Sequence, residues 1–297
     1  MPRMRLCVRD LPLERRSAHG RRASSLLFVQ VMQFWCSASS NAWTWEWKAY
    51  PGVWLFIVLI AVGTWRWNVA GAKRAGTPSG PVHPLFVVGL LAVWLALDWP
   101  IGALGAGYLA SVHMLQFLVI ALVAPPLLLR GLSPAAVSLL DGPSLGAALL
   151  RRLVEPPLSV ILFNVVVLVT HLPAVVDGLM TTQLGSMLID VLWLLSGTMF
   201  WWPVLFSGHV RRRFPPPLRM LYIIVGLMFS PVMFGIAGFL AYSETPMYGI
   251  YELAPPLPGI SSRDDHQAAG ALMSVGGAFI AFLAMSVIFF RWSKTEE

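Results

Sequence analysis

The sequence predicts an all-α fold, a polytopic transmembrane helix bundle of about seven spans. Of its 297 residues, 57% are hydrophobic and 12% are charged, whereas a soluble domain carries about 25% charged residues. The mean hydropathy is +0.70. The apolar residues fall into blocks near the ~20 residues that a helix needs to cross a bilayer. One multi-pass domain, with the lipid bilayer as its first partner, therefore fits better than two soluble domains.

Seven apolar blocks are expected to be the spans. The second is the least regular, because its apolar run from Leu85 to Leu97 is short before Asp98 and Pro100. Prolines in the third and sixth blocks are tolerated in membranes when neighbouring groups satisfy the freed carbonyls. Tryptophans before the first block and at the end of the fifth suit the interface between lipid and water. The blocks cover residues 51–70, 83–99, 104–129, 158–176, 184–206, 218–241 and 268–290.

Lysine and arginine residues predict the orientation of the bundle. Twelve of them lie in or after the odd-numbered spans, whereas only Arg263 follows an even-numbered one. Since basic residues are retained on the cytoplasmic side, we expect a cytoplasmic C-terminus and an N-terminus outside. This orientation explains the net charge of +7, so no nucleic-acid partner is expected. The twelve are Arg66, Lys73, Arg74, Arg130, Arg151, Arg152, Arg211, Arg212, Arg213, Arg219, Arg291 and Lys294.

Residues 1–42 are expected to form a basic leader-like or anchoring tail, and residues 43–297 the seven-helix membrane domain. Seven arginines of the tail would lie on the outer side, against the charge rule. Three interpretations compete. Residues 24–38 are the core of a signal peptide cleaved near Ala42, they are a retained short span or interfacial anchor, or translation begins at Met32.

A few polar residues share one level near the outer ends of the predicted helices. At ~1.5 Å per residue, His113 and His171 are each about five residues from the outer ends of their spans, and Asp190 lies in the outer part of the fifth. Imidazole and carboxylate bind zinc, copper or iron, and thioether sulfur selects cuprous copper. We therefore expect a transient copper site at the outer face. Its candidate ligands are His113, Met114, His171, Asp190, Asp265 and His266.

Each candidate also has a structural interpretation, because a buried histidine often caps a carbonyl and a His–Asp pair often joins two membrane helices. Enzyme motifs are missing: there is no Walker loop, G-x-S-x-G, H-E-x-x-H or C-x-x-C. Both cysteines, Cys7 and Cys36, precede the first span, so no disulfide framework or cysteine metal site is indicated. We expect no catalytic residue, no cofactor other than copper, and no enzyme.

Four motifs follow one another along the chain. They are His113-Met114-Leu115-Gln116 followed by Ala124-Pro125-Pro126-Leu127-Leu128; His171-Leu172-Pro173; Gly197-Thr198-Met199-Phe200-Trp201-Trp202-Pro203; and Asp265-His266-Gln267-Ala268-Ala269-Gly270 with Met273. In this order they resemble the CtaG-type cytochrome c oxidase assembly family of seven-helix inner-membrane proteins. The resemblance runs from about residue 43 to residue 290.

The resemblance implies a role in maturing a haem–copper oxidase, at its copper centres. It implies oxidase subunits or copper chaperones as partners, and the bacterial inner membrane as location. By position, His113, His171 and Asp265 match polar residues of the family's motifs.

Three departures from the family pattern bear on a metal site. Members often have a second histidine one turn after the first, where this chain has Phe117, and histidines in span five, where it has Ser186 and Asp190. The last motif often reads Asp-Gln, where this chain has Asp265-His266. Fewer histidines favour a weakly occupied delivery site, or a divergent paralogue with another client.

The leading hypothesis is a non-enzymatic assembly factor that binds copper, the nascent oxidase subunit, or both, at the outer face. The alternatives are a copper or small-solute transporter, a haem b electron-transfer protein with His113 and His171 as axial ligands, and a structural subunit of a larger membrane complex. Transport requires a polar route across the membrane. The inner halves of the spans are nearly all apolar, with Asn164 and Thr170 the main polar residues of span four, which counts against it.

Overall fold

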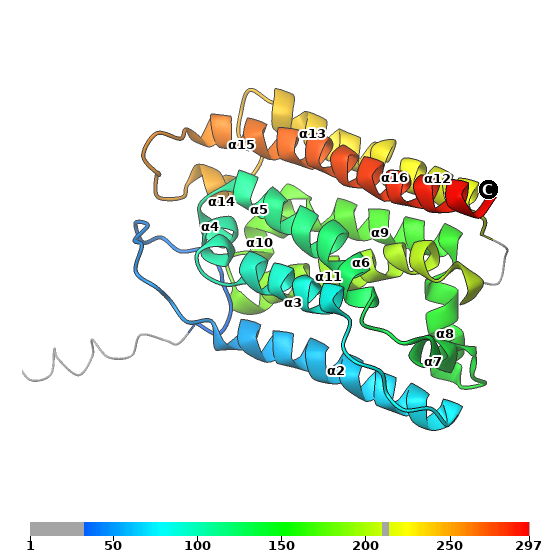
Figure 1. The fold of residues 1–297 in the computed structure, drawn as a ribbon. Coiled ribbons are helices and arrows are strands. Elements are labelled where there is room, and N and C mark those ends of the chain that lie inside the picture. The colour runs from blue at the N-terminus through cyan, green and yellow to red at the C-terminus, as the bar shows by residue number, and fades with distance from the viewer. Residues whose placement is uncertain (1–32, 210–213, 297) are drawn as a thin grey trace, which may run out of the picture. The chain divides into compact units, whose positions relative to one another are not determined.

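Helices account for all regular structure in the described part of the chain. The computed structural model describes residues 33–209 and 214–296, and these two ranges contain no strand (Figure 1). The chain divides into two units, residues 1–33 and residues 34–297, and every described helix belongs to the second. The predicted all-α class is confirmed.

Within the described residues, five helical stretches are long and apolar enough to cross a membrane, and two bent pairs raise the number to seven if each pair is one span. The prediction of about seven spans is thus confirmed by length and composition. The five stretches are Pro51–Ala75, Ala110–Leu129, Gln183–Leu205, Pro216–Tyr242 and Ser262–Thr295. The bent pairs are Pro84–Leu97 with Ile101–Gly107, at 47°, and Leu145–Leu153 with Pro156–Thr170, at 73°.

Short breaks and π-helical turns divide these stretches. The first half contains α2 (Pro51–Ala75), α3 (Pro84–Leu97), α4 (Ile101–Gly107), α5 (Ala110–Phe117), η1 (Leu118–Val123), α6 (Ala124–Leu129), α7 (Pro134–Val137), η2 (Ser138–Asp141) and α8 (Leu145–Leu153). The second half contains α9 (Pro156–Thr170), α10 (Pro173–Leu179), α11 (Gln183–Leu205), η3 (Ser207–His209), α12 (Pro216–Ile223), η4 (Ile224–Met228), α13 (Pro231–Tyr242), α14 (Gly249–Glu252), α15 (Ser262–Ala271), η5 (Leu272–Gly276) and α16 (Gly277–Glu296).

Prolines and hydroxyl caps decide where most of these helices begin. A proline opens α2, α3, α9, α12 and α13, where its missing N–H would have no helical partner anyway. The hydroxyls of Ser144, Thr182, Ser230 and Ser261 accept a backbone N–H from the first turns of α8, α11, α13 and α15. Each bond satisfies one of the free donors at a helix start.

The third span begins later than predicted, at Ala110 rather than at residue 104. Residues 104–107 belong to α4, which bends away from α3 after the break at Asp98. The extended backbone of Leu109 then separates α4 from α5. The apolar sequence of α4 had been joined to the next span, whereas the structure makes it a separate short helix.

The fourth and seventh spans also differ from their predicted bounds. The fourth helix ends at Thr170 rather than at residue 176, because Pro173 opens α10. The seventh begins at Ser262 rather than at residue 268, because the cap at Ser261 starts the helix within polar sequence. His171 therefore lies at the end of a helix and His266 lies inside one.

The segments that connect the spans gather at two ends of the bundle. At one end, hydrogen bonds join residues 34–50, 98–109, 171–182 and 243–261; this end is called the His113 end. At the other, called the Arg130 end, the end of α2 donates hydrogen bonds to the backbone of residues 131–136. The inside–outside orientation of these ends stays a prediction.

Residues 34–36 are built into the bundle at the His113 end. The side-chain oxygen of Gln183 accepts the N–H of Phe34, and the Trp35 indole donates to Asp190 at 2.8 Å. Cys36 donates to the carbonyl of Leu97; burial raises the pKa of its thiol, so the thiol stays protonated. Residues 34–42 of the predicted tail thus pack with the membrane domain, whereas residues 1–32 lie outside the described residues.

Cleavage near Ala42 would remove Trp35 and leave the buried carboxylate of Asp190 without its indole donor. We therefore expect the mature protein to retain residues 34–42. The measurement is N-terminal sequencing, or intact mass, of protein purified from membranes. A mature chain that begins at residue 43 would contradict this expectation.

α11 and η1 approach so closely that only glycine fits at residue 197. A Cβ added to Gly197 would lie 2.1 Å from the carbonyl oxygen of Ala121. That oxygen is backbone and cannot rotate away. The contact brings the third and fifth spans together between their two ends.

Gly197→Ala should therefore destabilise the bundle, by about 1–3 kcal/mol, because the helices must separate to accept the methyl group. The measurement is thermal unfolding of the purified protein in detergent. Gly235→Ala in α13 is the matched control, since a Cβ there meets nothing within 4 Å. Equal melting temperatures for the two variants would show that the contact does not limit packing.

Candidate functional site

Two buried histidines meet near the His113 end, with their ring centres 6.3 Å apart. His113 lies in the first turn of α5, and His171 ends α9; both are 1% exposed. Neither ring nitrogen of His113 has a hydrogen-bond partner among the described residues. His171 Nδ1 is 2.8 Å from the carbonyl of Val167, so it donates there, and its Nε2 has no described partner. In the neutral ring the lone pair of His171 then lies on Nε2.

Three nitrogens of these two buried rings have no partner among the described residues, and the same holds for the buried indole N–H groups of Trp43, Trp99, Trp201 and Trp202. Unlike an indole nitrogen, a neutral imidazole also carries a lone pair that can bind a metal. Burying a polar group without a hydrogen bond is unfavourable by about 1–3 kcal/mol in proteins, and most buried polar side-chain atoms have a partner. This pattern points to an ion or a water at the pair.

Aromatic rings surround the histidine pair. The Trp193 ring centre lies 4.9 Å from that of His113 and 5.6 Å from that of His171, nearly parallel to the latter at 26°. Phe117 lies 4.9 Å from His171, edge to face. The Trp193 indole donates to Thr170 Oγ1 at 2.9 Å, and Thr170 in turn donates to the carbonyl of Val166 at 2.7 Å. The indole is therefore held in one orientation.

The short helix α14 covers the pair. The Tyr251 hydroxyl donates to the carbonyl of Gly105 at 2.6 Å, and the Tyr248 hydroxyl donates to the carbonyl of His171 at 3.0 Å. Burial raises the pKa of both phenols, so both hydroxyls stay protonated and able to donate. The Tyr251 ring lies 5.8 Å from that of His113.

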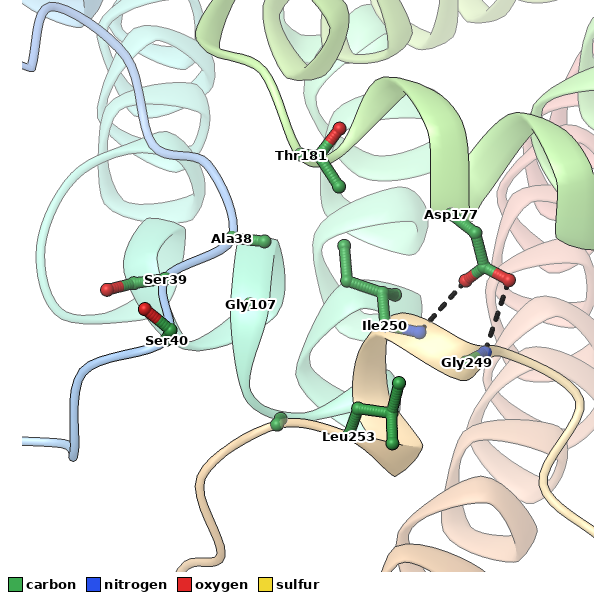
Figure 2. A pocket seen from close by; sticks show the side chains of 10 residues that line it. Ala38, Ser39, Ser40, Gly107, Asp177, Thr181, Gly249, Ile250 and Leu253 are labelled. Carbon is green, nitrogen blue, oxygen red and sulfur yellow. Dashed lines mark hydrogen bonds between the residues drawn. The ribbon is translucent and has the colours of Figure 1, made fainter.

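Asp177 holds α14 in place from α10. Its two carboxylate oxygens accept the N–H groups of Gly249, at 3.2 Å, and Ile250, at 3.0 Å (Figure 2). A carboxylate at a helix start satisfies free donors and complements their partial positive charge. Asp177 also lines a pocket of about 500 Å³ with residues 38–40, Thr181 and α14 (Figure 2). A second cavity, of about 80 Å³, is lined by Tyr251 and Asp265 among others.

His266 is held within the protein by both ring nitrogens. Its Nδ1 donates to the carbonyl of Ser262 at 2.8 Å, and its Nε2 accepts the N–H of Tyr248 at 3.2 Å. This neutral tautomer leaves no free lone pair in this arrangement. His266 therefore joins α15 to the segment that leads into α14.

Asp265 and Asp190 are occupied by hydrogen bonds of the bundle. The Asp265 carboxylate accepts the N–H of Ala110 at 2.6 Å, the N–H of Ser111 at 3.1 Å, and the Ser111 hydroxyl. Asp190 accepts the Trp35 indole. Met114 is fully buried next to His113 in α5.

The six predicted ligands thus gather near one end, but only the histidine pair has unpartnered nitrogens. No three His, Cys, Asp or Glu side chains among the described residues form a group that could hold a metal ion. The wider ligand set of the sequence analysis remains a prediction.

Sequence reasoning missed Trp193, Tyr251 and Asp177. A lone tryptophan among 13 gives no signal that separates a site residue from a lipid-facing one. The helix α14 has four residues, too few for a periodic pattern. The Asp177 bonds join segments 72 and 73 residues apart.

The model of one protein family, described as cytochrome c oxidase caa3 assembly factor (Caa3_CtaG), matches residues 58–295. The chain belongs to this family. The matched range includes the histidine pair, Trp193, α14 and Asp265. The curated proteins and the solved structures contain no significant match to the chain.

In this caa3 assembly factor, Asp265→Asn should destabilise the fold by about 1–3 kcal/mol. An amide keeps one acceptor oxygen but turns an NH2 group toward backbone donors. The measurement is the free energy of unfolding in detergent. Asp264→Asn is the control, because Asp264 is exposed and, within the described part of the chain, its carboxylate bonds the Ser261 hydroxyl at its own helix start. Equal losses for the two variants would contradict the assigned role of Asp265.

Proposed function

We propose that this caa3 assembly factor carries copper at the histidine pair and delivers it to a cytochrome c oxidase subunit during assembly. The observation that carries the proposal is the set of three unpartnered ring nitrogens on His113 and His171. Neutral imidazole nitrogen is a copper ligand. The family description names the oxidase as the client, whereas the role of copper is our proposal.

The separation of the two rings suits a bound ion. A metal–nitrogen bond is about 2.0 Å long, so two imidazoles whose centres lie about 6 Å apart are close enough for one nitrogen of each to hold the same ion. The centres of His113 and His171 are 6.3 Å apart.

A binding role is favoured over a catalytic one. The Tyr251 and Tyr248 hydroxyls and the carboxylates of Asp265 and Asp177 all hold backbone groups of the bundle. The polar groups next to the histidines therefore fix their surroundings instead of facing a substrate. We place delivery at the outer face, because the predicted orientation puts the His113 end there; the partners would be a copper chaperone and the nascent oxidase subunit.

The haem alternative finds less support at this pair. Trp193 lies within 5.6 Å of both imidazoles, beside the line that joins them, where a porphyrin ring would extend. A transport route also finds less support. The polar residues deeper in the bundle bond one another: Ser230 donates to Asn164, and Tyr222 and Ser159 share a hydrogen bond of 2.9 Å.

The test is complementation of a strain that lacks the gene by the variant His113→Leu. Leucine removes both ring nitrogens without breaking a described hydrogen bond, so the fold should be as stable as the wild type or more stable. Oxidase activity and oxidase copper content should nevertheless stay at the level of the deletion strain. Both are measured in membranes with equal amounts of wild-type or variant protein.

The matched control is His83→Asn. His83 is exposed and caps α3, and asparagine keeps an acceptor for the N–H of Leu85. It should restore oxidase fully. Full restoration by His113→Leu would refute copper delivery at this pair, and normal oxidase in the deletion strain itself would refute the assembly role in this cell.

A further inference from the structure

We propose that the pair takes copper specifically as Cu(I), and that Trp193 is a selectivity residue whose indole face contacts the ion. This inference rests on the proposed function, because it concerns the same site. It adds the oxidation state of the cargo and one residue that sequence motifs did not indicate.

The surroundings of the pair favour an ion that is satisfied by two nitrogens. Zn(II) takes four ligands, and Cu(II) prefers square-planar or tetragonal sites of nitrogen and oxygen. Cu(I) is a d¹⁰ ion that is stable with two ligands in a line. The rings of Phe117, Trp193 and Tyr251 lie around the two imidazoles. The Tyr251 hydroxyl donates its hydrogen bond to the carbonyl of Gly105. Oxygen ligands for Zn(II) or Cu(II) would have to displace these rings.

Trp193 is placed to contact a cation that both histidines bind. Its ring is nearly parallel to that of His171, at 26°, with the centres 5.6 Å apart. A metal bonded to a histidine nitrogen lies in the plane of that imidazole. An ion in the plane of His171, on the side of His113, therefore lies over or beside the indole face, since Trp193 is also 4.9 Å from His113. Tryptophan is the best aromatic partner for a cation within about 6 Å of its ring centre.

The indole is fixed before any ion arrives. Thr170 accepts its N–H and is itself bound to the backbone of α9, the helix that His171 ends. Phe117 packs edge-on against the indole, with the ring centres 5.3 Å apart. Trp193 is 0% exposed, so the contact is shielded from water, where cation–π attraction is strongest.

The experiment uses the full chain purified in detergent. It is titrated separately with Cu(I) in competition with a chromophoric chelator, with Ag(I) as a redox-inert substitute, and with Zn(II). We expect one Cu(I) or Ag(I) per chain and Zn(II) bound at least about a hundredfold more weakly. Binding of Cu(I) and Ag(I) should also change the near-ultraviolet absorption of tryptophan.

The decisive variants are Trp193→Leu and Trp193→Phe. The first should weaken Cu(I) binding about three- to thirtyfold, and the second by less, since phenylalanine keeps a weaker π face. Both should abolish the tryptophan absorption change. Trp201→Phe is the matched control in the same helix: Trp201 is buried and its indole N–H has no partner among the described residues. It should keep both the affinity and the absorption change.

The outcomes separate this inference from the proposed function. If Trp193→Leu, folded by its melting temperature, binds Cu(I) like the wild type, or if Zn(II) binds as tightly as Cu(I), the role of Trp193 or the Cu(I) selectivity is refuted, while copper delivery stands. If the wild type takes up no copper, or if His113→Leu binds it equally well, the proposed copper site itself is refuted. The unpartnered nitrogens are then explained by water.

Discussion

The bundle depends on one carboxylate, that of Asp265 in α15, which accepts the free N–H groups at the start of the membrane helix α5. α5 begins after the extended residue Leu109, whose side chain makes no capping hydrogen bond. The first N–H groups of a helix have no internal partner, and leaving them unpaired in a low-dielectric interior is costly. Asp265, in the first turn of α15, accepts two of them and the Ser111 hydroxyl. It joins the third and seventh spans at the start of the helix that carries His113.

At the His113 end, other polar side chains also bind connecting segments, and the histidine pair differs from them. Asp177 holds α14, Asp190 holds the segment before α2, and His266 holds the approach to α14 with both nitrogens. Nearly every strongly polar side chain at this end is used to tie connecting segments to the helices. His113 and His171 are equally buried but are left with unpartnered nitrogens. The buried indole N–H groups of Trp43 and Trp99 at this end also lack a partner among the described residues, but only an imidazole offers a lone pair that can bind an ion.

Hydrogen bonds of this kind also hold the short helix α14 beside the histidine pair. The hydroxyls of Tyr251 in α14 and of Tyr248 just before it donate to the backbone carbonyls of Gly105 and His171. The segment is short and would have little stability alone. Its position therefore depends on the hydrogen bonds that it makes to Gly105, His171 and Asp177.

The sequence alone determined the fold class and most of the spans, because the length and apolar content of a membrane helix are local properties of the chain. It also singled out His113 and His171, since an ionisable residue in an apolar block is conspicuous. It also predicted Asp190, Asp265 and His266 as metal ligands, because a local sequence pattern does not show whether a polar group already has a hydrogen-bond partner. Only the tertiary structure decided that. The bonds from Trp35 to Asp190, from Ala110 to Asp265 and from Tyr248 to His266 join residues 155, 155 and 18 positions apart, and the placing of Trp193 against both histidines likewise depends on how the third, fourth and fifth spans pack.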